Sequence, residues 1–159
     1  MNNSLQTSVG ASPSDILSAA CLQRGCGVRL SENDHPMTIL IVDDQEIVRK
    51  LIRVALKGTI DAVLLEANHA AEALKIAREH DGPIDLLVSD VAMPGNMNGI
   101  EMAAQLSNAH PKMRVVVMSG YQPEALTMER NWHFIEKPFA VSEIRARIRS
   151  ILFDNRLAA

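Results

Sequence analysis

The feature that most constrains the fold is an alternation of short apolar runs with longer amphipathic stretches, which begins at Met37 and continues to Phe153. Within the amphipathic stretches, apolar residues recur three and four positions apart, which is the spacing of one helix face. The apolar runs are nearly continuous, as is typical of strands covered on both faces of a sheet. Because parallel strands need crossover connections, this order predicts an α/β fold with a parallel central sheet and right-handed crossovers.

Five strands and five helices are expected in alternating order. The apolar runs predict strands over residues 38–42, 62–67, 84–89, 113–118 and 133–136. The amphipathic stretches predict helices over residues 45–58, 69–80, 100–108, 123–130 and 140–153. Gly58 is expected to stop the first helix, Asn68 to cap the second and Pro123 to begin the fourth.

Length and charge narrow the class of protein. With 159 residues, 47% of them hydrophobic and 22% charged, the chain is expected to be soluble and to fold around one core. Its 16 Lys and Arg against 19 Asp and Glu give a net charge of -3, so no global positive field attracts nucleic acid or anionic lipid. The sequence has no apolar stretch of signal-peptide or membrane-span length. We therefore expect a cytoplasmic protein that binds neither nucleic acid directly nor membranes.

The chain divides into an extension and a domain. Residues 1–36 are rich in Ser, Asn, Gly and Ala, and we expect them to form a disordered N-terminal extension. The alternative is that translation begins at Met37, directly before the first apolar run. Residues 37–155 are expected to form the folded domain, with no output domain after it.

Polar side chains interrupt the pattern where four of the apolar runs end. Asp43 and Asp44 follow the first run, and Asp90 follows the third. Ser119 follows the fourth run and Lys137 follows the fifth. Because ligands bind at the carboxyl edge of open α/β sheets, these five residues are candidates for one site. Three neighbouring carboxylates need a cation, and Mg²⁺ is a hard ion that suits oxygen ligands.

The same residues suit phosphoryl transfer. A carboxylate needs no general base to act as a nucleophile toward phosphorus, so Asp90 is a candidate for that role. Mg²⁺ and Lys137 would supply the positive charge that brings a phosphoryl group onto it, and Ser119 would supply a hydroxyl donor. Phosphoryl transfer is catalysed chiefly by such positioning and electrostatics.

Four sequence blocks carry a family resemblance. ILIVDDQEIVR, LLVSDVAMPGNMNGIEMA, VVVMSGY and FIEKPF follow one another in this order, each at the end of a predicted strand. Together they resemble the motifs of bacterial response-regulator receiver domains, over about residues 37–153. The resemblance implies a flavodoxin-like, doubly wound, five-stranded parallel sheet with strand order 2-1-3-4-5.

The resemblance also implies a role for each site residue. Asp90 matches the phosphoacceptor, and Lys137 and Ser119 match the amine and the hydroxyl that act on the phosphoryl group. The implied metal ligands are Asp43, Asp44, Asp90 and the backbone carbonyl of Ala92. Ser119 and Phe134 match the two switch residues that respond to phosphorylation. A cis bond between Lys137 and Pro138 is expected by the same analogy.

The function implied is that of a stand-alone response regulator. It would accept a phosphoryl group on Asp90 from a histidine kinase or a histidine phosphotransfer protein, and it would signal by altered protein–protein binding. The alternative is a phosphate sink or an intermediate carrier in a phosphorelay. A phosphatase is disfavoured because such enzymes carry Asp-x-Asp after the first strand, where this chain has Asp43-Asp44-Gln45. We therefore expect no enzymatic turnover of an external substrate.

One interval departs from the common pattern of the family. Ser119 and Lys137 are only 18 positions apart, so the fourth helix is expected to be short and the usual output face altered. The site residues also have purely structural interpretations. Asp43 and Asp44 suit a helix N-terminus, Ser119 suits a turn and Phe134 suits a core. A solvated face or a docking surface would each explain the basic residues of the last helix, which are Arg145, Arg147 and Arg149.

Overall fold

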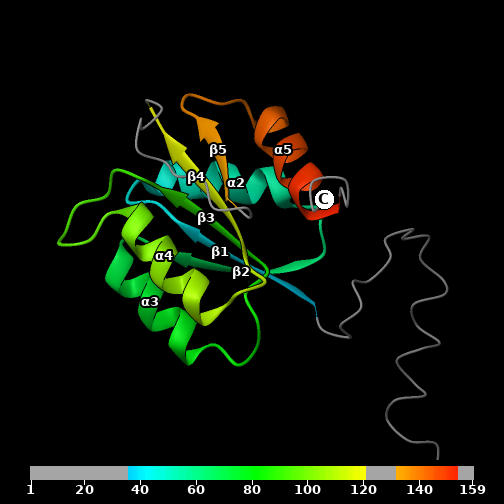
Figure 1. Ribbon diagram of the computed structural model, residues 1–159. Helices are drawn as coiled ribbons and strands as arrows, with labels where there is room; N and C mark the ends of the chain where they lie inside the picture. The colour runs from blue at the N-terminus through cyan, green and yellow to red at the C-terminus, as the bar shows by residue number, and fades with distance from the viewer. Residues whose placement is uncertain (1–35, 121–131, 154–159) are drawn as a thin grey trace, which may run out of the picture. The chain divides into compact units, whose positions relative to one another are not determined.

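The fold is a parallel sheet covered by helices on both faces (Figure 1). The computed structural model describes residues 36–120 and 132–153. The five strands lie in the order β2-β1-β3-β4-β5, and every neighbouring pair is parallel. They are β1 (Met37–Val42), β2 (Ala62–Ala67), β3 (Leu86–Asp90), β4 (Arg114–Ser119) and β5 (Trp132–Glu136). The predicted flavodoxin-like order 2-1-3-4-5 is therefore confirmed.

The described helices cover the sheet in pairs (Figure 1). On one face lie α2 (Glu46–Leu56) and α5 (Val141–Phe153), and on the other lie α3 (Ala70–Glu79) and α4 (Gly99–Ala109). None of these helices is both long enough and apolar enough to cross a membrane. The short helix predicted at 123–130 lies outside the described residues. The same holds for the extension at 1–36, apart from the exposed Pro36.

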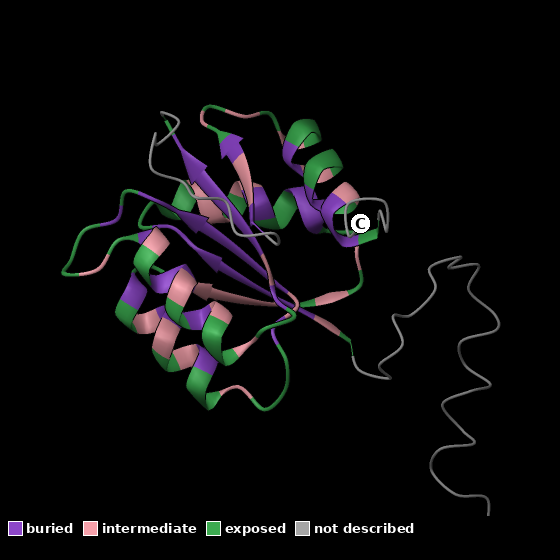
Figure 2. Ribbon diagram, in the orientation of Figure 1, coloured by how far each residue is buried: buried purple, intermediate pink, exposed green. Residues whose placement is uncertain are grey.

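The sheet divides the apolar core into two clusters, and its central strands are buried along their length (Figure 2). Successive side chains of a strand point to opposite faces, so Leu40 enters one cluster and Ile41 the other. The α3–α4 cluster is centred on Leu40, Val42, Leu87, Val115, Val117, Met102 and Leu106. The α2–α5 cluster is centred on Ile39, Ile41, Val88, Val116, Ile52, Ile144 and Ile148. Burial on both faces explains why the strands read as continuous apolar runs.

Helix ends differ partly from those expected from the sequence. Helix α2 ends at Leu56, and Gly58 follows with a φ of 70°, a left-handed conformation that glycine adopts without strain. Helix α3 is capped by His69 rather than Asn68, because the His69 Nδ1 accepts the Glu72 N–H at 3.0 Å. Asn68 instead donates its backbone N–H to the Glu72 carboxylate at 2.8 Å. The two residues therefore share the helix start, with the cap one position later than predicted.

The strand register brings the polar strand ends to one level. Val42 of β1 is paired with Ser89 of β3, so the next residue of each strand carries a carboxylate at the same edge. Ser119 is the last residue of β4 and is paired with Glu136, the last residue of β5. Lys137 follows directly. The predicted convergence of strand ends at the carboxyl edge of the sheet is thus observed.

Candidate functional site

Three aspartates gather at the carboxyl edge of the sheet. Asp43 and Asp44 lie in the turn between β1 and α2, and Asp90 ends β3. One carboxylate oxygen from each lies within 4.8 Å of those of the other two. Asp43 is fully buried and Asp90 is 5% exposed, whereas Asp44 is exposed. The cluster therefore consists of two buried carboxylates, Asp43 and Asp90, and one solvent-exposed carboxylate, Asp44.

The Lys137 ammonium joins the two buried carboxylates. Its Nζ lies 2.8 Å from Asp43 Oδ2 and 3.1 Å from Asp90 Oδ2. The Lys137 backbone N–H donates to the Ser119 carbonyl at 2.8 Å, which fixes the start of the loop after β5 to the end of β4. The bond from Lys137 to Pro138 is cis, as the resemblance led us to expect.

Every polar atom of Asp43 has a hydrogen-bond partner. Its Oδ2 accepts from Lys137 and its Oδ1 accepts the Gln45 N–H at 2.9 Å. Its own N–H donates to the Ala67 carbonyl of β2 at 3.3 Å, and its carbonyl accepts from Arg49 at 2.6 Å. A buried polar group is costly unless it is bonded in this way, so the turn after β1 is held in one conformation.

Burial and charge act against each other on the two partners of the ion pair. Burial raises the pKa of the Asp43 carboxyl, and the hydrogen bonds from Lys137 and Gln45 offset only part of that rise. Burial alone would lower the pKa of the Lys137 ammonium, but its hydrogen bonds to Asp43 and Asp90 and their charges outweigh it and raise that pKa. Lys137 therefore remains a cation at neutral pH.

The other residues predicted for the site lie at different distances from its centre. Ser119 is buried at the end of β4, on the same edge as the aspartates. Ala92 is exposed in the loop after β3, and its N–H donates to Asp90 Oδ1 at 3.4 Å. Phe134 is half-buried within β5 and lines a shallow cavity of about 560 Å³ against α5, beside Glu143 and Arg147. The described residues that line this cavity include none of the three aspartates.

Two supporting residues escaped the sequence analysis. Gly99, the first residue of α4, packs against the backbone of Asp90, and a Cβ at this position would collide with the Asp90 carbonyl oxygen. The buried Ser89 donates its Oγ–H to that same carbonyl at 2.9 Å. The backbone behind Asp90 is therefore fixed by a close approach that only glycine permits. Gly99 in the MPGNMNG loop was the available signal, but spacing alone does not show which backbone it approaches.

The donor set of the acidic cluster fits a hard divalent cation. Its three side chains offer carboxylate oxygens, which Mg²⁺ prefers over nitrogen and sulfur ligands. Two of them are anchored by the protein, and the exposed third leaves a side open to water and phosphate oxygens, which Mg²⁺ usually retains as ligands. Asp43, Asp44 and Asp90 are thus the described residues that would hold the ion.

Comparison with known proteins gives a consistent match. A family model described as the response regulator receiver domain matches residues 39–149. The crystal structure of the receiver domain of the hybrid histidine kinase CckA is 33% identical, with a TM-score of 0.61, over 72% of this chain and 98% of that one. A CheY-like receiver domain protein from Methanospirillum hungatei has a TM-score of 0.66 at 21% identity, over 76% of this chain and 96% of that one.

Two curated relatives place the matching region within longer proteins. The sensor kinase CckA of Brucella abortus is 32% identical over 119 residues, which are 72% of this chain and 12% of the kinase. The response regulator MprA of Mycobacterium leprae is 34% identical over 120 residues, which are 73% of this chain and 51% of that protein. The chain thus spans about half or less of the length of these relatives.

Proposed function

Because this chain belongs to the response regulator receiver domain family of two-component signalling, we propose that Asp90 accepts a phosphoryl group from a histidine kinase or a histidine phosphotransfer protein. The observation that carries the proposal is the contact of Lys137 with both Asp90 and Asp43 at the carboxyl edge of the sheet. A buried nucleophilic carboxylate, a cation and further acidic ligands form the set that phosphoryl transfer requires. We place this reaction in the cytoplasm.

The proposed reaction is a direct displacement at phosphorus. One carboxylate oxygen of Asp90 attacks the phosphorus of a phosphohistidine, and an O–P bond forms as the P–N bond breaks. The bonding electron pair stays on the imidazole nitrogen that carried the phosphorus. The donor leaves as a neutral imidazole, with its proton already on the other ring nitrogen or taken from water. Lys137 pairs with the incoming phosphoryl oxygens, and the buried Ser119 hydroxyl lies at the same edge to donate to them.

A divalent cation is part of the proposed site. Asp43, Asp44 and Asp90 would hold Mg²⁺, with the Ala92 carbonyl as the further ligand implied by the family resemblance. When bound, Mg²⁺ neutralises phosphoryl charge that would otherwise be repelled by the three carboxylates. The protein contributes the anchoring, because the Asp43 carboxylate is fixed by Lys137 and by the Gln45 N–H.

We propose that phosphorylation changes the binding of a protein partner rather than starting turnover of an external substrate. Ser119 and Phe134 lie on the neighbouring strands β4 and β5, where a phosphoryl group on Asp90 would bias one of two side-chain packings. The cavity between Phe134 and α5 gives that aromatic side chain a place where its packing can change. This is the output expected of a response regulator.

A second candidate is an intermediate carrier or phosphate sink in a phosphorelay. The observation that favours it is the similarity to receiver regions within kinases, namely CckA and the autoinducer sensor kinase/phosphatase LuxN of Vibrio harveyi. The same acidic site would serve both functions. The carrier requires phosphoryl transfer back to a histidine phosphotransfer protein, whereas the partner-binding function does not.

The phosphorylation proposal is tested with acetyl phosphate as the donor. Intact-mass measurement is expected to show one phosphoryl group per chain in the presence of MgCl₂, and none with EDTA or in the Asp90→Asn variant. Asp61→Asn is the matched control, because Asp61 lies in an exposed turn before β2, and it should be phosphorylated like the wild type. Absence of an adduct, or an adduct that survives Asp90→Asn, would reject the proposal.

A second experiment separates the two candidate functions. Phosphorylated protein is freed of donor and mixed with a histidine phosphotransfer protein, and the phosphoryl group is followed by mass. Rapid reverse transfer supports the carrier. Retention on Asp90, together with a phosphorylation-dependent change in partner binding, supports the response regulator.

A further inference from the structure

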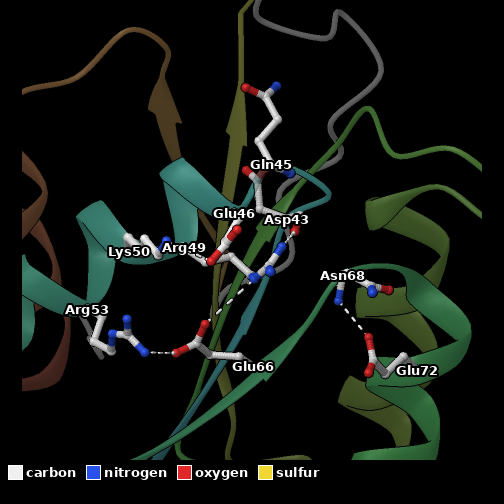
Figure 3. Close-up of polar contacts among 9 residues, drawn as sticks. All are labelled: Asp43, Gln45, Glu46, Arg49, Lys50, Arg53, Glu66, Asn68 and Glu72. Atoms are coloured by element: carbon white, nitrogen blue, oxygen red, sulfur yellow. Dashed lines mark hydrogen bonds and ion pairs between the residues drawn. The ribbon is translucent and has the colours of Figure 1, made fainter.

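Arg49, in the first half of α2, bonds to the backbone of the acidic site. Its Nη1 donates to the carbonyl oxygen of Asp43 at 2.6 Å, and its side chain is only 15% exposed (Figure 3). This carbonyl belongs to the peptide unit that links Asp43 to Asp44. Because a peptide unit is planar, fixing its carbonyl oxygen also fixes the direction in which the chain reaches Asp44.

The Arg49 guanidinium is itself held from the neighbouring strand. Its Nε lies 3.6 Å from Glu66 Oε2 on β2 (Figure 3). The residue after Glu66 is Ala67, whose carbonyl accepts the Asp43 N–H at 3.3 Å. The backbone of Asp43 is therefore tied to β2 on both sides, directly through its N–H and through Arg49 at its carbonyl.

From these contacts we propose that Arg49 is a positioning residue of the acidic site and that Glu66 holds it in place. Arg49 orients the Asp43–Asp44 peptide so that the exposed Asp44 carboxylate stays within reach of a divalent cation bound by Asp43 and Asp90. The inference rests on the proposed function, since it deepens the role of the same site. It adds two residues that do not touch the bound ion.

The physical basis is the difference between the three carboxylates. Asp43 and Asp90 are buried and contact Lys137, so their positions are fixed without Arg49. Asp44 is exposed, and its placement depends on the backbone that carries it. Loss of a group that orients a metal ligand without touching the metal commonly weakens metal affinity by about tenfold or more.

Arg53 provides a matched control on the same helix. It contacts the same Glu66, with Nη1 at 3.0 Å from Oε1 (Figure 3). In the part of the chain that the structure describes, Arg53 forms no hydrogen bond with Asp43. Loss of either arginine removes one cation from Glu66. Only loss of Arg49 releases the Asp43 carbonyl, so the pair separates positioning from a general effect on helix α2.

The test is titration of the purified chain with MgCl₂ in a calorimeter, in wild type, Arg49→Gln and Arg53→Gln. Arg49→Gln is expected to raise the Kd for Mg²⁺ about tenfold, and Arg53→Gln to change it less than about twofold. At saturating Mg²⁺ the rate of phosphorylation by acetyl phosphate should return to within about twofold of wild type, because the loss is in ion binding. Thermal unfolding without Mg²⁺ checks that each variant is folded.

Two further variants decide the matter if Arg49→Gln does not fold. Arg49→Lys keeps a cation but loses the guanidinium that contacts both the Asp43 carbonyl and Glu66, and Glu66→Gln weakens the anchor of Arg49, so each should raise the Kd for Mg²⁺ above the wild-type value. Wild-type Mg²⁺ affinity in these variants, or an equal loss in Arg53→Gln, would overturn the inference while leaving the proposed function standing. A wild type that binds no Mg²⁺ and accepts no phosphoryl group would overturn both.

Discussion

At the scale of single residues, Lys137 has two separate effects on the site. It stabilises the buried Asp43 and Asp90 carboxylates, at 2.8 and 3.1 Å, and it presents a cation to an incoming phosphoryl group. Removing one partner of a buried pair leaves uncompensated charge, so its loss carries a structural cost as well as a chemical one. The two effects are separable. Bound Mg²⁺ can neutralise the carboxylates in place of Lys137, but it cannot take the position from which the Lys137 ammonium meets the phosphoryl group.

Lys137→Gln is therefore expected to slow phosphorylation without weakening ion binding. The rate with acetyl phosphate at saturating Mg²⁺ should fall about 100-fold, as for loss of one donor to a developing charge. The Kd for Mg²⁺ should stay the same or fall, because the competing ammonium is gone. Lys50→Gln is the control, since Lys50 forms an exposed pair with Glu46 on α2. Unchanged phosphorylation kinetics in Lys137→Gln would contradict this role.

His133 makes stability depend on pH on the acid side. Burial lowers the pKa of its imidazole in the folded state, and the charges of Arg147 and Arg114 lower it further. The unfolded chain takes up the proton first as pH falls below about 6.5. The stability that the neutral imidazole allows is thus present above that pH and lost below it.

The corresponding experiment is urea unfolding at pH 7.5 and pH 5.5 in wild type and His133→Gln. The wild type should lose more free energy of unfolding between the two pH values than the variant does. An equal loss in both proteins would show that other groups cause the acid sensitivity.

At the scale of elements, the start of α4 supports the back of the site. Asn98 and Glu101 form a reciprocal capping box, in which the Asn98 side chain accepts from the Glu101 N–H at 2.9 Å. The helix then begins at Gly99, whose N–H donates to the Val91 carbonyl at 3.1 Å. A helix that starts against the Asp90 backbone limits how far the phosphoacceptor can move.

Gly99→Ala is expected to destabilise the protein by about 1–3 kcal/mol, because the added methyl group meets the Asp90 carbonyl and forces the helix start away. Phosphorylation should slow in parallel. Gly120→Ala is the matched control, since among residues 36–120 and 132–153 a Cβ there meets no atom within 4 Å. Denaturant unfolding measures both, and equal stability of the two variants would argue against close packing at Gly99.

The same elements show what a sequence can and cannot predict. The meeting of Asp43, Asp90 and Lys137 was predictable, because parallel strands place all their carboxyl ends at one edge. The strand order came instead from the resemblance of four sequence blocks to a known family. The cap of α3 at His69 was missed because either of two adjacent residues can accept a helix N–H. The link from Arg49 to Glu66 was missed because charged residues 17 positions apart on different elements carry no periodic signal. Contacts that follow from strand register can be predicted from the sequence, whereas contacts that depend on how far a side chain reaches cannot.

At the scale of the whole molecule, the sheet separates the two core clusters. Ile84 belongs to the α3–α4 cluster and Ile148 to the α2–α5 cluster, and both are buried. Residues that share no packing partners contribute additively to stability. Ile84→Val and Ile148→Val should each cost about 1 kcal/mol.

The double variant tests that separation. Its loss of unfolding free energy should equal the sum of the two single losses within about 0.5 kcal/mol. The matched comparison is Ile52→Val with Ile148→Val, two residues of the same cluster on the packed helices α2 and α5, whose coupling should be larger. Coupling across the sheet as large as within one face would contradict independent cores.

Two independent cores also shape how such a domain can diverge over evolutionary time. A substitution that loosens α3 or α4 removes contacts within the cluster on that face, so compensating substitutions are expected on the same side of the sheet. Each side can therefore drift on its own, and the helices of one face can be remodelled for a new partner while those of the other keep their packing. Asp43, Asp90 and Lys137 lie at the ends of strands that both sides share, so either face can change without replacing them, provided that Arg49 on α2 and Gly99 on α4 are kept.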